Sequence, residues 1–338
     1  MKNKRLSYLD NIKVMLTWLV IFHHAGQAYG NGGEWPYKPS NPEEFMPWIW
    51  HFFAVNASFF MGLYFLISGY FIPSSFDRQG CLTFLKKKLL RLGLPLVMVG
   101  SVLSFGCRKF ELAHLWFVEN LLFFCLLYAI YRSVFRPISH DCDSRPTVVG
   151  LALLALVMGL GSWVIRQYSL QDHWVSIWIL VLEPAHYLQY VMMFVLGILA
   201  YRFNWIEKMS NRTGAITLAI GTMLAADHYL RGSLPWDDWV WQWFGLYESF
   251  LCLFINFGLL WLFRQYLNQA NRFMQWCAAQ SYGAYIIHLP LMLAIQNLSD
   301  GVWVGAFGKF MLIGVVTTLV SFLLTWLMRM IPGVKQII

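Results

Sequence analysis

Two side chains in one predicted helix combine a cation with a base. Lys13 and His24 lie in the apolar stretch 9–29, eleven residues apart. An α-helix turns by about 100° per residue, so these side chains differ in direction by only about 20° and lie about 16 Å apart along the axis. Neutral imidazole can serve as a general base near physiological pH, and an ammonium group can bind phosphate. His23 points roughly 80° away from Lys13. The spacing predicts a site formed by Lys13 and His24.

A carboxylate on a second stretch is the predicted partner of His24. Glu119 lies in the apolar stretch 115–135, about one helical turn inside its outer boundary. It could orient the imidazole ring or compensate its charge if the two helices are neighbours. The alternative is an interhelical hydrogen bond that only stabilises the bundle. His186 and Glu248 are interpreted as packing or interfacial residues.

Further polar residues are predicted to line the same site. Ser281, Tyr285 and His288 follow an i, i+4, i+7 pattern, so they occupy one stripe of a helix that faces the bundle interior. A buried histidine such as His288 is more often a structural residue than a catalyst. Asn56 and Ser68, in the second apolar stretch, are the other predicted lining residues.

The densest basic patch lies between the second and third apolar stretches. Lys87, Lys88 and Arg91 are three or four residues apart, so they cluster on one side of a helix that Pro95 is expected to kink. Such a patch can anchor the chain to anionic lipid head groups. Alternatively, it can cradle a phosphorylated ligand from the cytosol. Both interpretations place the patch on the cytoplasmic side.

The composition is that of a protein that crosses a membrane several times. Of 338 residues, 58% are hydrophobic and only 12% are charged, and the mean hydropathy is +0.53. Soluble domains average about a quarter charged residues. The net charge of +8 does not indicate nucleic-acid binding, because the basic residues lie between apolar stretches. The six cysteines show no metal-binding spacing and are expected to be reduced, and no metal is expected.

The apolar segments predict an all-α, polytopic membrane protein with one domain over 1–338 and about ten transmembrane helices. These segments are 9–29, 49–72, 91–107, 115–135, 147–165, 178–201, 213–230, 245–263, 276–297 and 304–328. Most of the 25 Lys and Arg residues fall on the same side as the two chain ends. Cytoplasmic loops carry the excess of positive charge, so both termini are predicted to be cytoplasmic. The first outer loop, 30–45, is rich in Gly, Pro and Asn and is expected to form a lid or a substrate lip.

These motifs together resemble the acyltransferase 3 family of integral membrane proteins, particularly its glucan biosynthesis protein C-like branch. The first-span signature of the family is a basic residue, ten intervening residues and a histidine, which Lys13 and His24 match. Further matching stretches occur in family order, so the resemblance covers nearly the whole chain. They are FFMGLYFLISGYF (59–71), FLKKKLLRLGLPL (84–96), LWFVENLLFF (115–124) and SYGAYIIHLP (281–290).

The resemblance implies transfer of an acyl group, often acetyl or succinyl, from cytosolic acyl-CoA to a hydroxyl of an extracytoplasmic carbohydrate. His24 would be the general base or an acyl relay, with Glu119 beside it. Lys13, Lys88 and Arg91 would hold the phosphates of CoA at the inner mouth. Lysine stands at positions 13 and 88, where arginine is the commoner family residue, and lysine lacks the planar fork that binds phosphate at two points.

The same intramembrane residues also fit a transporter. Lys13, His24, Glu119 and His288 could form a proton or substrate pathway in a proton-coupled multi-span carrier. The chain shows no evident internal repeat, on which many transporters are built, and this favours the enzyme. The expected partners are acyl-CoA, a hydroxyl acceptor and membrane lipids, and the expected location is the cell membrane.

Overall fold

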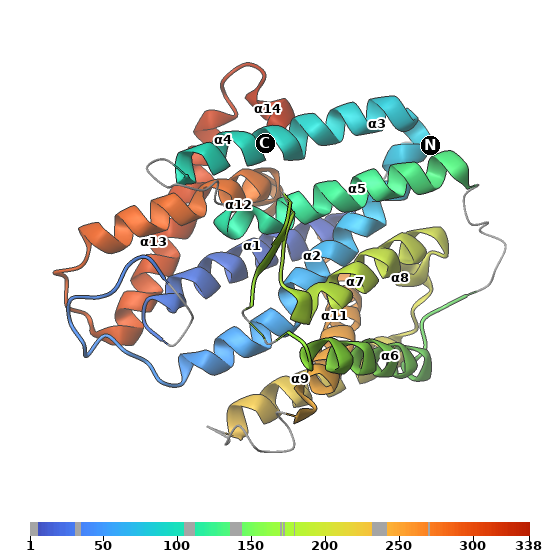
Figure 1. The fold of residues 1–338 in the computed structure, drawn as a ribbon, viewed down its shortest axis with the longest axis horizontal. Helices are drawn as coiled ribbons and strands as arrows, with labels where there is room; N and C mark the ends of the chain where they lie inside the picture. The colour runs from blue at the N-terminus through green and yellow to red at the C-terminus, as the bar shows by residue number, and fades with distance from the viewer. Residues whose placement is uncertain are drawn as a thin grey trace.

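Long apolar helices form most of the structure (Figure 1). The computed structural model describes residues 6–30, 35–104, 112–135, 144–169, 171, 173–178, 180–231, 242–269 and 271–338. The longer helices are α1 (Ser7–Gln27), α2 (Ile49–Gln79), α3 (Cys81–Lys88), α4 (Leu94–Leu103), α5 (Trp116–Val134), α6 (Val148–Arg166), α7 (Pro184–Arg202), α9 (Asn211–Leu230), α11 (Phe244–Tyr266), α12 (Arg272–Leu298) and α13 (Gly305–Met328). Shorter helical elements are the π-helix η1 (Leu89–Gly93), the 3-10 helix η2 (Ala113–Leu115), α8 (Trp205–Lys208) and α14 (Val334–Ile337).

Seven of the described helices are long and apolar enough to cross a membrane. They are α2, α5 extended by η2, α6, α7, α11, α12 and α13. The chain is therefore a multi-pass membrane protein. The sequence predicted about ten spans, and that number is not confirmed. The cytoplasmic placement of both termini stays a prediction.

The other three predicted spans are helical, but within the described residues they are too short or not apolar enough to count as membrane-crossing helices. The segment 9–29 corresponds to α1, whose Asp10 and Lys13 lower its hydropathy. The segment 91–107 corresponds to α4, which has only 10 residues, and the end of this segment lies outside the described residues. The segment 213–230 corresponds to α9, which is long enough but less apolar.

A short β-hairpin departs from the all-helical prediction. Strands β1 (Val175–Ile177) and β2 (Leu180–Leu182) pair antiparallel. The predicted helix 178–201 therefore begins later, at Pro184. Proline suits the first helical position but disfavours a helical conformation in the residue before it. Glu183 is accordingly extended, with φ −105° and ψ 105°.

Two glycines let α2 and α7 cross in close contact at the centre of the bundle. A Cβ atom on Gly69 would lie 2.2 Å from the backbone oxygen of Phe194, and one on Gly197 would lie 2.0 Å from that of Leu66. No larger residue fits at either position unless the backbone moves. Small residues allow such close helix packing in lipid, where the hydrophobic effect does not drive association. This crossing fixes the position of α7, which carries one side of the site described below.

A π-helical turn lies just before Pro95, where the sequence analysis expected a kink. Helix α3 continues through η1 into α4, and Pro95 lies in the first turn of α4. Proline has no N–H group, so it cannot donate to the carbonyl of Arg91, four residues earlier. The hydroxyl of Tyr282 on α12 donates to that carbonyl at 2.6 Å. The helix that carries the basic patch is thereby tied to α12.

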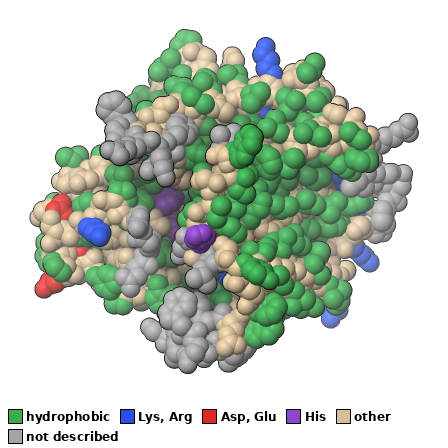
Figure 2. Space-filling model, in the orientation of Figure 1, with side chains coloured by type: hydrophobic (Ala, Val, Ile, Leu, Met, Phe, Trp, Pro, Cys, Tyr) green, Lys and Arg blue, Asp and Glu red, His purple; other side chains and the backbone are tan. Residues whose placement is uncertain are grey.

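The helices form two groups with α1 and α2 between them, and part of the outer surface is strongly hydrophobic. In Figure 1, α3, α4 and α5 run along one edge of the molecule, and α6, α9 and α11 lie toward the opposite edge. Helices α1 and α2 pass between these groups. Figure 2 shows a broad hydrophobic face, as expected for a surface in lipid, with Lys and Arg side chains at its margins. Histidine side chains are visible near the middle of this view.

Candidate active site

His24 and His288 form a direct hydrogen bond between α1 and α12. His24 Nδ1 and His288 Nε2 lie 2.9 Å apart, and the two ring centroids lie 5.0 Å apart. His288 Nδ1 lies 2.6 Å from the carbonyl oxygen of Tyr285. His288 is fully buried, whereas His24 is half-buried. The structure therefore brings together three of the predicted site residues.

The Tyr285 carbonyl determines the protonation pattern of this pair. A carbonyl oxygen only accepts hydrogen bonds, so His288 Nδ1 carries the hydrogen. In a neutral His288 ring, Nε2 is then an acceptor, and His24 Nδ1 donates to it. The other nitrogen of His24, Nε2, keeps its lone pair. The arrangement holds His24 in the tautomer that a general base needs.

A third histidine, His114, lies beside the pair. Its ring centroid is 4.7 Å from that of His288 and 6.4 Å from that of His24. Pro290 in α12 cannot donate to the carbonyl of Ile286, and His114 Nε2 lies 3.0 Å from this oxygen. His114 Nε2 therefore carries the hydrogen. Its Nδ1 is a buried acceptor that has no hydrogen-bond partner in the described part of the chain.

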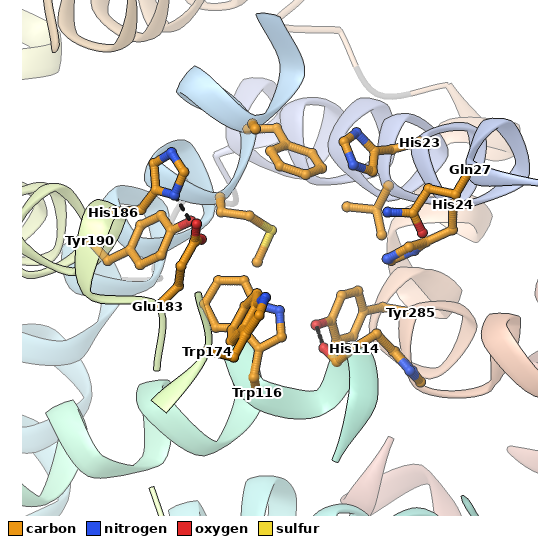
Figure 3. Close-up of a pocket in the computed structure, with 14 residues that line it drawn as sticks. His23, His24, Gln27, His114, Trp116, Trp174, Glu183, His186, Tyr190 and Tyr285 are labelled. Carbon is orange, nitrogen blue, oxygen red and sulfur yellow. Dashed lines mark hydrogen bonds and ion pairs between the residues drawn. The ribbon is translucent and has the colours of Figure 1, made fainter. Parts of the chain in front are cut away.

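A cavity of about 570 Å³ opens beside His24. This volume lies within the range of about 300–1,000 Å³ that is typical of small-molecule sites. Figure 3 shows His23, His24 and Gln27 of α1 on one side and Glu183 and His186 on the opposite side. Among the described residues, no group of three His, Cys, Asp or Glu side chains is arranged to hold a metal ion.

The side of the cavity opposite His24 carries a buried charged network. His186 Nδ1 lies 2.7 Å from Glu183 Oε2, and His186 Nε2 lies 2.9 Å from Glu248 Oε1. Arg166 forms an ion pair with the other oxygen of Glu248. These contacts connect α6, α7 and α11. The interpretation of His186 and Glu248 as packing or interfacial residues is therefore incomplete, because His186 also faces the cavity.

The first outer loop places an aromatic ring against His24. Trp35 stacks on His24 with ring centroids 5.9 Å apart and ring planes at 18°. Its indole nitrogen donates to Gln296 Oε1 on α12 at 2.9 Å. The described part of the loop 30–45 thus lies next to His24. Its expected role as a lid or substrate lip stays a prediction.

Asp300 fastens this loop to the turn that follows α12. Its carboxylate accepts hydrogen bonds from Ser40 Oγ at 2.6 Å, from Ser40 N at 3.1 Å and from Tyr37 Oη at 2.5 Å. These bonds, those from Ser40 and Tyr37 foremost, lower the pKa of Asp300 from 3.8 to about 2. The buried Lys309 supports the same turn by donating to the carbonyls of Asp300 at 3.3 Å and Val302 at 2.7 Å. We call the Tyr37, Ser40 and Asp300 contacts the Asp300 clasp.

Glu119 does not pair with His24 in the structure. Its carboxylate accepts a hydrogen bond from the backbone nitrogen of Val181 at 2.9 Å, which holds β2 against α5. His288 takes the place that the sequence analysis gave to Glu119. The predicted and observed partners of Glu119 differ because the backbone N–H group of Val181 in the hairpin needs an acceptor.

Two further predicted lining residues lie on α2 but not at the cavity. Asn56 is buried and Ser68 is half-buried. Helix α2 instead contributes Ala57, Phe60 and Met61 to the lining. Asn56 points about 100° away from Ala57, and Ser68 lies about 10 Å farther along the helix than Met61.

Lys13 contacts an aromatic ring and a carboxylate near the start of α1. Its Nζ atom lies 4.3 Å from the ring centroid of Phe71 and 3.4 Å from Asp10 Oδ1. The side chain is one-third exposed, at 33%, so a ligand can reach it. Its contact with a donor stays a prediction.

Two cations of the basic patch, Lys88 and Arg91, lie over other aromatic rings. Lys88 Nζ is 5.4 Å from the ring centroid of Phe84, and the guanidinium of Arg91 is 5.6 Å from that of Tyr282. Arg91 is exposed and Lys88 is half-buried. A phosphate site shared by these cations and Lys13 stays a prediction.

Sequence reasoning missed part of the cavity wall. Pro290 could have indicated a role for a donor such as His114, because the proline leaves the carbonyl of Ile286 without its helical partner. Glu183 and His186 are three residues apart at the start of a helix, a spacing that places a carboxylate next to an imidazole. Trp174 gave no such signal, because it reaches the cavity only through the position of the hairpin.

Comparison with known proteins agrees with this chemistry. A family model described as an acyltransferase domain matches residues 6–326. The chain belongs to the acyltransferase 3 family. Similar relatives are the glucans biosynthesis protein C of Escherichia coli O1:K1 / APEC, of strain SMS-3-5 / SECEC and of O9:H4 strain HS. Each is 23% identical in an alignment that covers 86% of this chain and 83% of the relative. No solved structure matches the chain.

Membership of the acyltransferase 3 family identifies the protein as a membrane acyltransferase in general terms. The matched residues extend from before Lys13 to beyond His288, so they include the whole histidine cluster. The transporter that the intramembrane charges also allowed has no comparable support.

Proposed function

We propose that this protein is an O-acyltransferase that moves an acetyl or succinyl group from cytosolic acyl-CoA to a hydroxyl of an extracytoplasmic carbohydrate. Family membership supports acyl transfer, and the name of the relatives supports a carbohydrate acceptor. The observation that carries the proposal is the hydrogen bond between His24 and His288 at the edge of the cavity. It supplies a base of defined tautomer at a place that a hydroxyl group can enter.

In the proposed reaction, His24 Nε2 accepts the proton of the acceptor hydroxyl. The hydroxyl oxygen attacks the thioester carbonyl carbon and forms a tetrahedral intermediate. When the carbon–sulfur bond breaks, the acyl group stays on the acceptor oxygen, and the His24 imidazolium gives its proton to the CoA thiolate. His288 stabilises this imidazolium because its Nε2 accepts the hydrogen bond from His24 Nδ1.

An acyl relay would use the same nitrogen. His24 Nε2 would attack the thioester, CoA would leave as the thiolate, and the acceptor hydroxyl would then take the acyl group from the imidazole. This route needs a second base for the hydroxyl proton. His114 lines the cavity and its Nδ1 is an acceptor, but this nitrogen is buried, so the His114 side chain would have to move for Nδ1 to take the hydroxyl proton.

The negative charge of the tetrahedral intermediate needs a hydrogen-bond donor. Gln27 lies three residues after His24 on α1 and lines the same cavity, so its amide can donate to this oxygen. Glu119 has no role in the scheme, because its carboxylate is bound to the backbone of Val181.

The donor would approach from the end of the bundle at which α1 and α12 begin. Asn11, near the start of α1, donates to the carbonyl of Leu267, shortly before α12. Farther along both helices His24 meets His288, so α1 and α12 run in the same direction. Lys13 then lies about 16 Å before the histidine pair along α1. Arg91 contacts Tyr282, about 9 Å before the pair along α12. The pantetheine arm of CoA would extend over this distance.

Purified protein in lipid nanodiscs tests the proposal directly. The protein is incubated with acetyl-CoA or succinyl-CoA and short gluco-oligosaccharides, and free CoA and acylated saccharide are both measured. The wild type should produce them in equal amounts, and His24→Ala should produce neither. His288→Leu should lower the rate by about 10²–10⁴-fold, the usual contribution of acid–base catalysis, because the His24 tautomer is no longer fixed.

A matched variant separates catalysis from packing. The His23 ring lies 5.1 Å from the rings of both Phe53 and Phe60, so His23→Phe should preserve the packing and most of the rate. Folded His24→Ala protein that transfers acyl groups at the wild-type rate would show that His24 is not the base.

A further inference from the structure

The cavity wall opposite His24 combines a buried carboxylate with aromatic rings, and the mechanism above uses neither. We propose that this wall, formed by Glu183, Trp116, Trp174 and Tyr190, binds the acceptor and selects uncharged saccharides through Glu183. The inference rests on the proposed acyl transfer. It goes beyond acyl transfer in two respects. It names the residues that orient the acceptor, and it states that the acceptor is uncharged.

The charge state of Glu183 follows from its hydrogen-bonded neighbours. Both ring nitrogens of His186 face carboxylate oxygens, at 2.7 Å from Glu183 and 2.9 Å from Glu248. Carboxylates accept hydrogen bonds, so both nitrogens donate and the ring is an imidazolium. Arg166 supplies a second positive charge to Glu248. The positive charges of His186 and Arg166 favour the ionised form of both carboxylates, including Glu183, although Glu183 is buried.

An ionised carboxylate at the cavity wall recognises hydroxyl groups. Its two oxygens offer about four acceptor sites, and the hydrogen bond from His186 occupies one of them. Hydroxyl groups of a saccharide can donate to it, and hydrogen bonds to a charged acceptor are stronger than neutral ones. A saccharide with a carboxylate or phosphate of its own would be repelled by Glu183, and partial exclusion of water strengthens this repulsion.

Three aromatic rings next to Glu183 provide a surface for a sugar ring. Trp116 and Trp174 have centroids 5.3 Å apart, and Tyr190 is also 5.3 Å from Trp116. All three line the cavity. The C–H groups on one face of a sugar are apolar and slightly positive, so they pack against the negative face of an aromatic ring. Trp174 is 43% exposed, which places it where a longer saccharide would leave the cavity.

The two sides of the cavity would hold opposite edges of the same sugar. In Figure 3, Glu183 lies across the cavity from His24, and Trp116 and Trp174 lie along the side between them. A sugar ring stacked on the tryptophans would donate hydroxyls to Glu183 at one edge. A hydroxyl at the other edge would then face His24, so the contact with Glu183 selects which hydroxyl is acylated.

A purely structural network would behave differently. The ion pairs among Arg166, Glu248 and His186 connect three helices and contribute to folding whether or not an acceptor binds. In that case, loss of Glu183 would lower stability but leave the KM values for the acceptor and the donor in the same ratio. Kinetics that vary the two substrates separately therefore distinguish the two roles.

The test compares paired acceptors that differ only in charge. Wild-type protein in nanodiscs receives acetyl-CoA with short gluco-oligosaccharides or with the same oligosaccharides oxidised at C6 to carboxylates. We expect the kcat/KM for the neutral acceptor to be at least about ten-fold higher. Glu183→Gln should raise the KM for the neutral acceptor about ten-fold and reduce the preference, while the KM for acetyl-CoA stays unchanged.

A second variant keeps the test decisive if Glu183→Gln does not fold. Trp174 is partly exposed and outside the helices, so Trp174→Ala should fold. It should raise the acceptor KM several-fold without changing the KM for acetyl-CoA, and Trp174→Phe should restore most of the loss. Trp178 is the matched control, because it is 99% exposed at the tip of the same hairpin and does not line the cavity. Trp178→Ala should have wild-type kinetics.

Two results would overturn the inference while leaving acyl transfer intact. One is equal kcat/KM for the neutral and carboxylated acceptors in the wild type. The other is an unchanged acceptor KM in Trp174→Ala. Failure of the proposed function is a separate result, because the wild type would then release no CoA with any hydroxyl acceptor.

Discussion

At the scale of single residues, backbone oxygens decide which histidine nitrogen can act as a base. The Tyr285 carbonyl fixes the hydrogen of His288, and His288 in turn fixes that of His24. The Ile286 carbonyl does the same for His114. The tautomer of the proposed base is thus set without a carboxylate next to it. Acyl transfer in this account depends on the lone pair that remains on His24 Nε2.

Substitution of Lys13 tests whether this residue binds the acyl-CoA donor. A lysine that only reaches lipid head groups needs no more than a long cationic side chain. If Lys13 binds a phosphate of the donor, Lys13→Gln should weaken acetyl-CoA binding roughly ten- to hundred-fold, the effect of a lost hydrogen bond to a charged group. Lys13→Arg should keep most of the affinity. Equilibrium binding to the purified, folded proteins measures the effect.

Asp10 provides the control for this prediction. Its carboxylate lies 3.4 Å from Lys13 Nζ, so Asp10→Asn removes a competing partner and should not weaken acetyl-CoA binding. Equal affinity of the wild type, Lys13→Gln and Lys13→Arg would remove Lys13 from the donor site and leave Lys88 and Arg91 as the proposed phosphate contacts.

Residues on one helix were easier to predict from sequence than residues that meet across helices. Tyr285 and His288 were placed correctly in the bundle interior because helical periodicity alone puts them on one stripe. The partner of His24 could not be predicted, since it depends on which helices are neighbours. Glu119 was paired with the wrong group because its acceptor role is satisfied by Val181 in the hairpin. No pattern in the sequence indicated that contact.

At the scale of elements, the Asp300 clasp connects the outer loop to the end of α12. It holds the segment that follows Trp35, and Trp35 stacks on His24. Asp300→Asn should weaken the clasp, since a neutral amide accepts weaker hydrogen bonds from Ser40 and Tyr37 than a carboxylate does. Backbone amides of the loop should then exchange hydrogen faster at neutral pH. Glu43→Gln, an exposed change in the same loop, should leave exchange unchanged.

The clasp should also open in acid. The pKa of Asp300 in the folded protein, about 2, lies below its usual value of 3.8. The stabilisation from this group is therefore fully present above about pH 4 and is lost as the pH falls toward 2. A spin label at Lys38→Cys should become more mobile over that interval. Unchanged mobility between about pH 5 and 2 would contradict the assigned role of Asp300.

Element positions were more predictable than element boundaries and types. Each of the ten predicted apolar segments overlaps a described helix. The hairpin before α7 was missed, because its strands are apolar and run directly into the helical segment 178–201. Pro184 was the available boundary signal. The π-turn η1 could not be predicted, since Leu89–Gly93 differs little in composition from an ordinary helix.

At the scale of the whole molecule, the histidine pair lies between a basic region and a clasped loop. The proposed donor contacts lie toward the starts of α1 and α12, whereas the Asp300 clasp lies beyond their ends. This order fits a donor that enters from one side of the membrane and an acceptor that enters from the other. Acyl transfer across the bundle would therefore need no movement of His24, the proposed base.

The proposed order predicts opposite accessibility for two exposed positions. Lys38 lies in the outer loop and Arg78 at the end of α2, and both side chains are exposed. In a variant without native cysteines, Lys38→Cys should react with a membrane-impermeant thiol reagent added outside cells. Arg78→Cys should react only after the membrane is opened. External labelling of Arg78→Cys would place the basic patch on the wrong side for a cytosolic donor.

The central claim is that His24 transfers acyl groups to an extracytoplasmic carbohydrate. The most direct measurement is mass spectrometry of the surface, periplasmic and secreted glycans of cells that lack the protein or produce either the wild type or His24→Ala at equal membrane levels. The account predicts an acetyl or succinyl mass increment on glycans from wild-type cells only. The same acyl pattern in all three samples, or an increment that persists with His24→Ala, would contradict it.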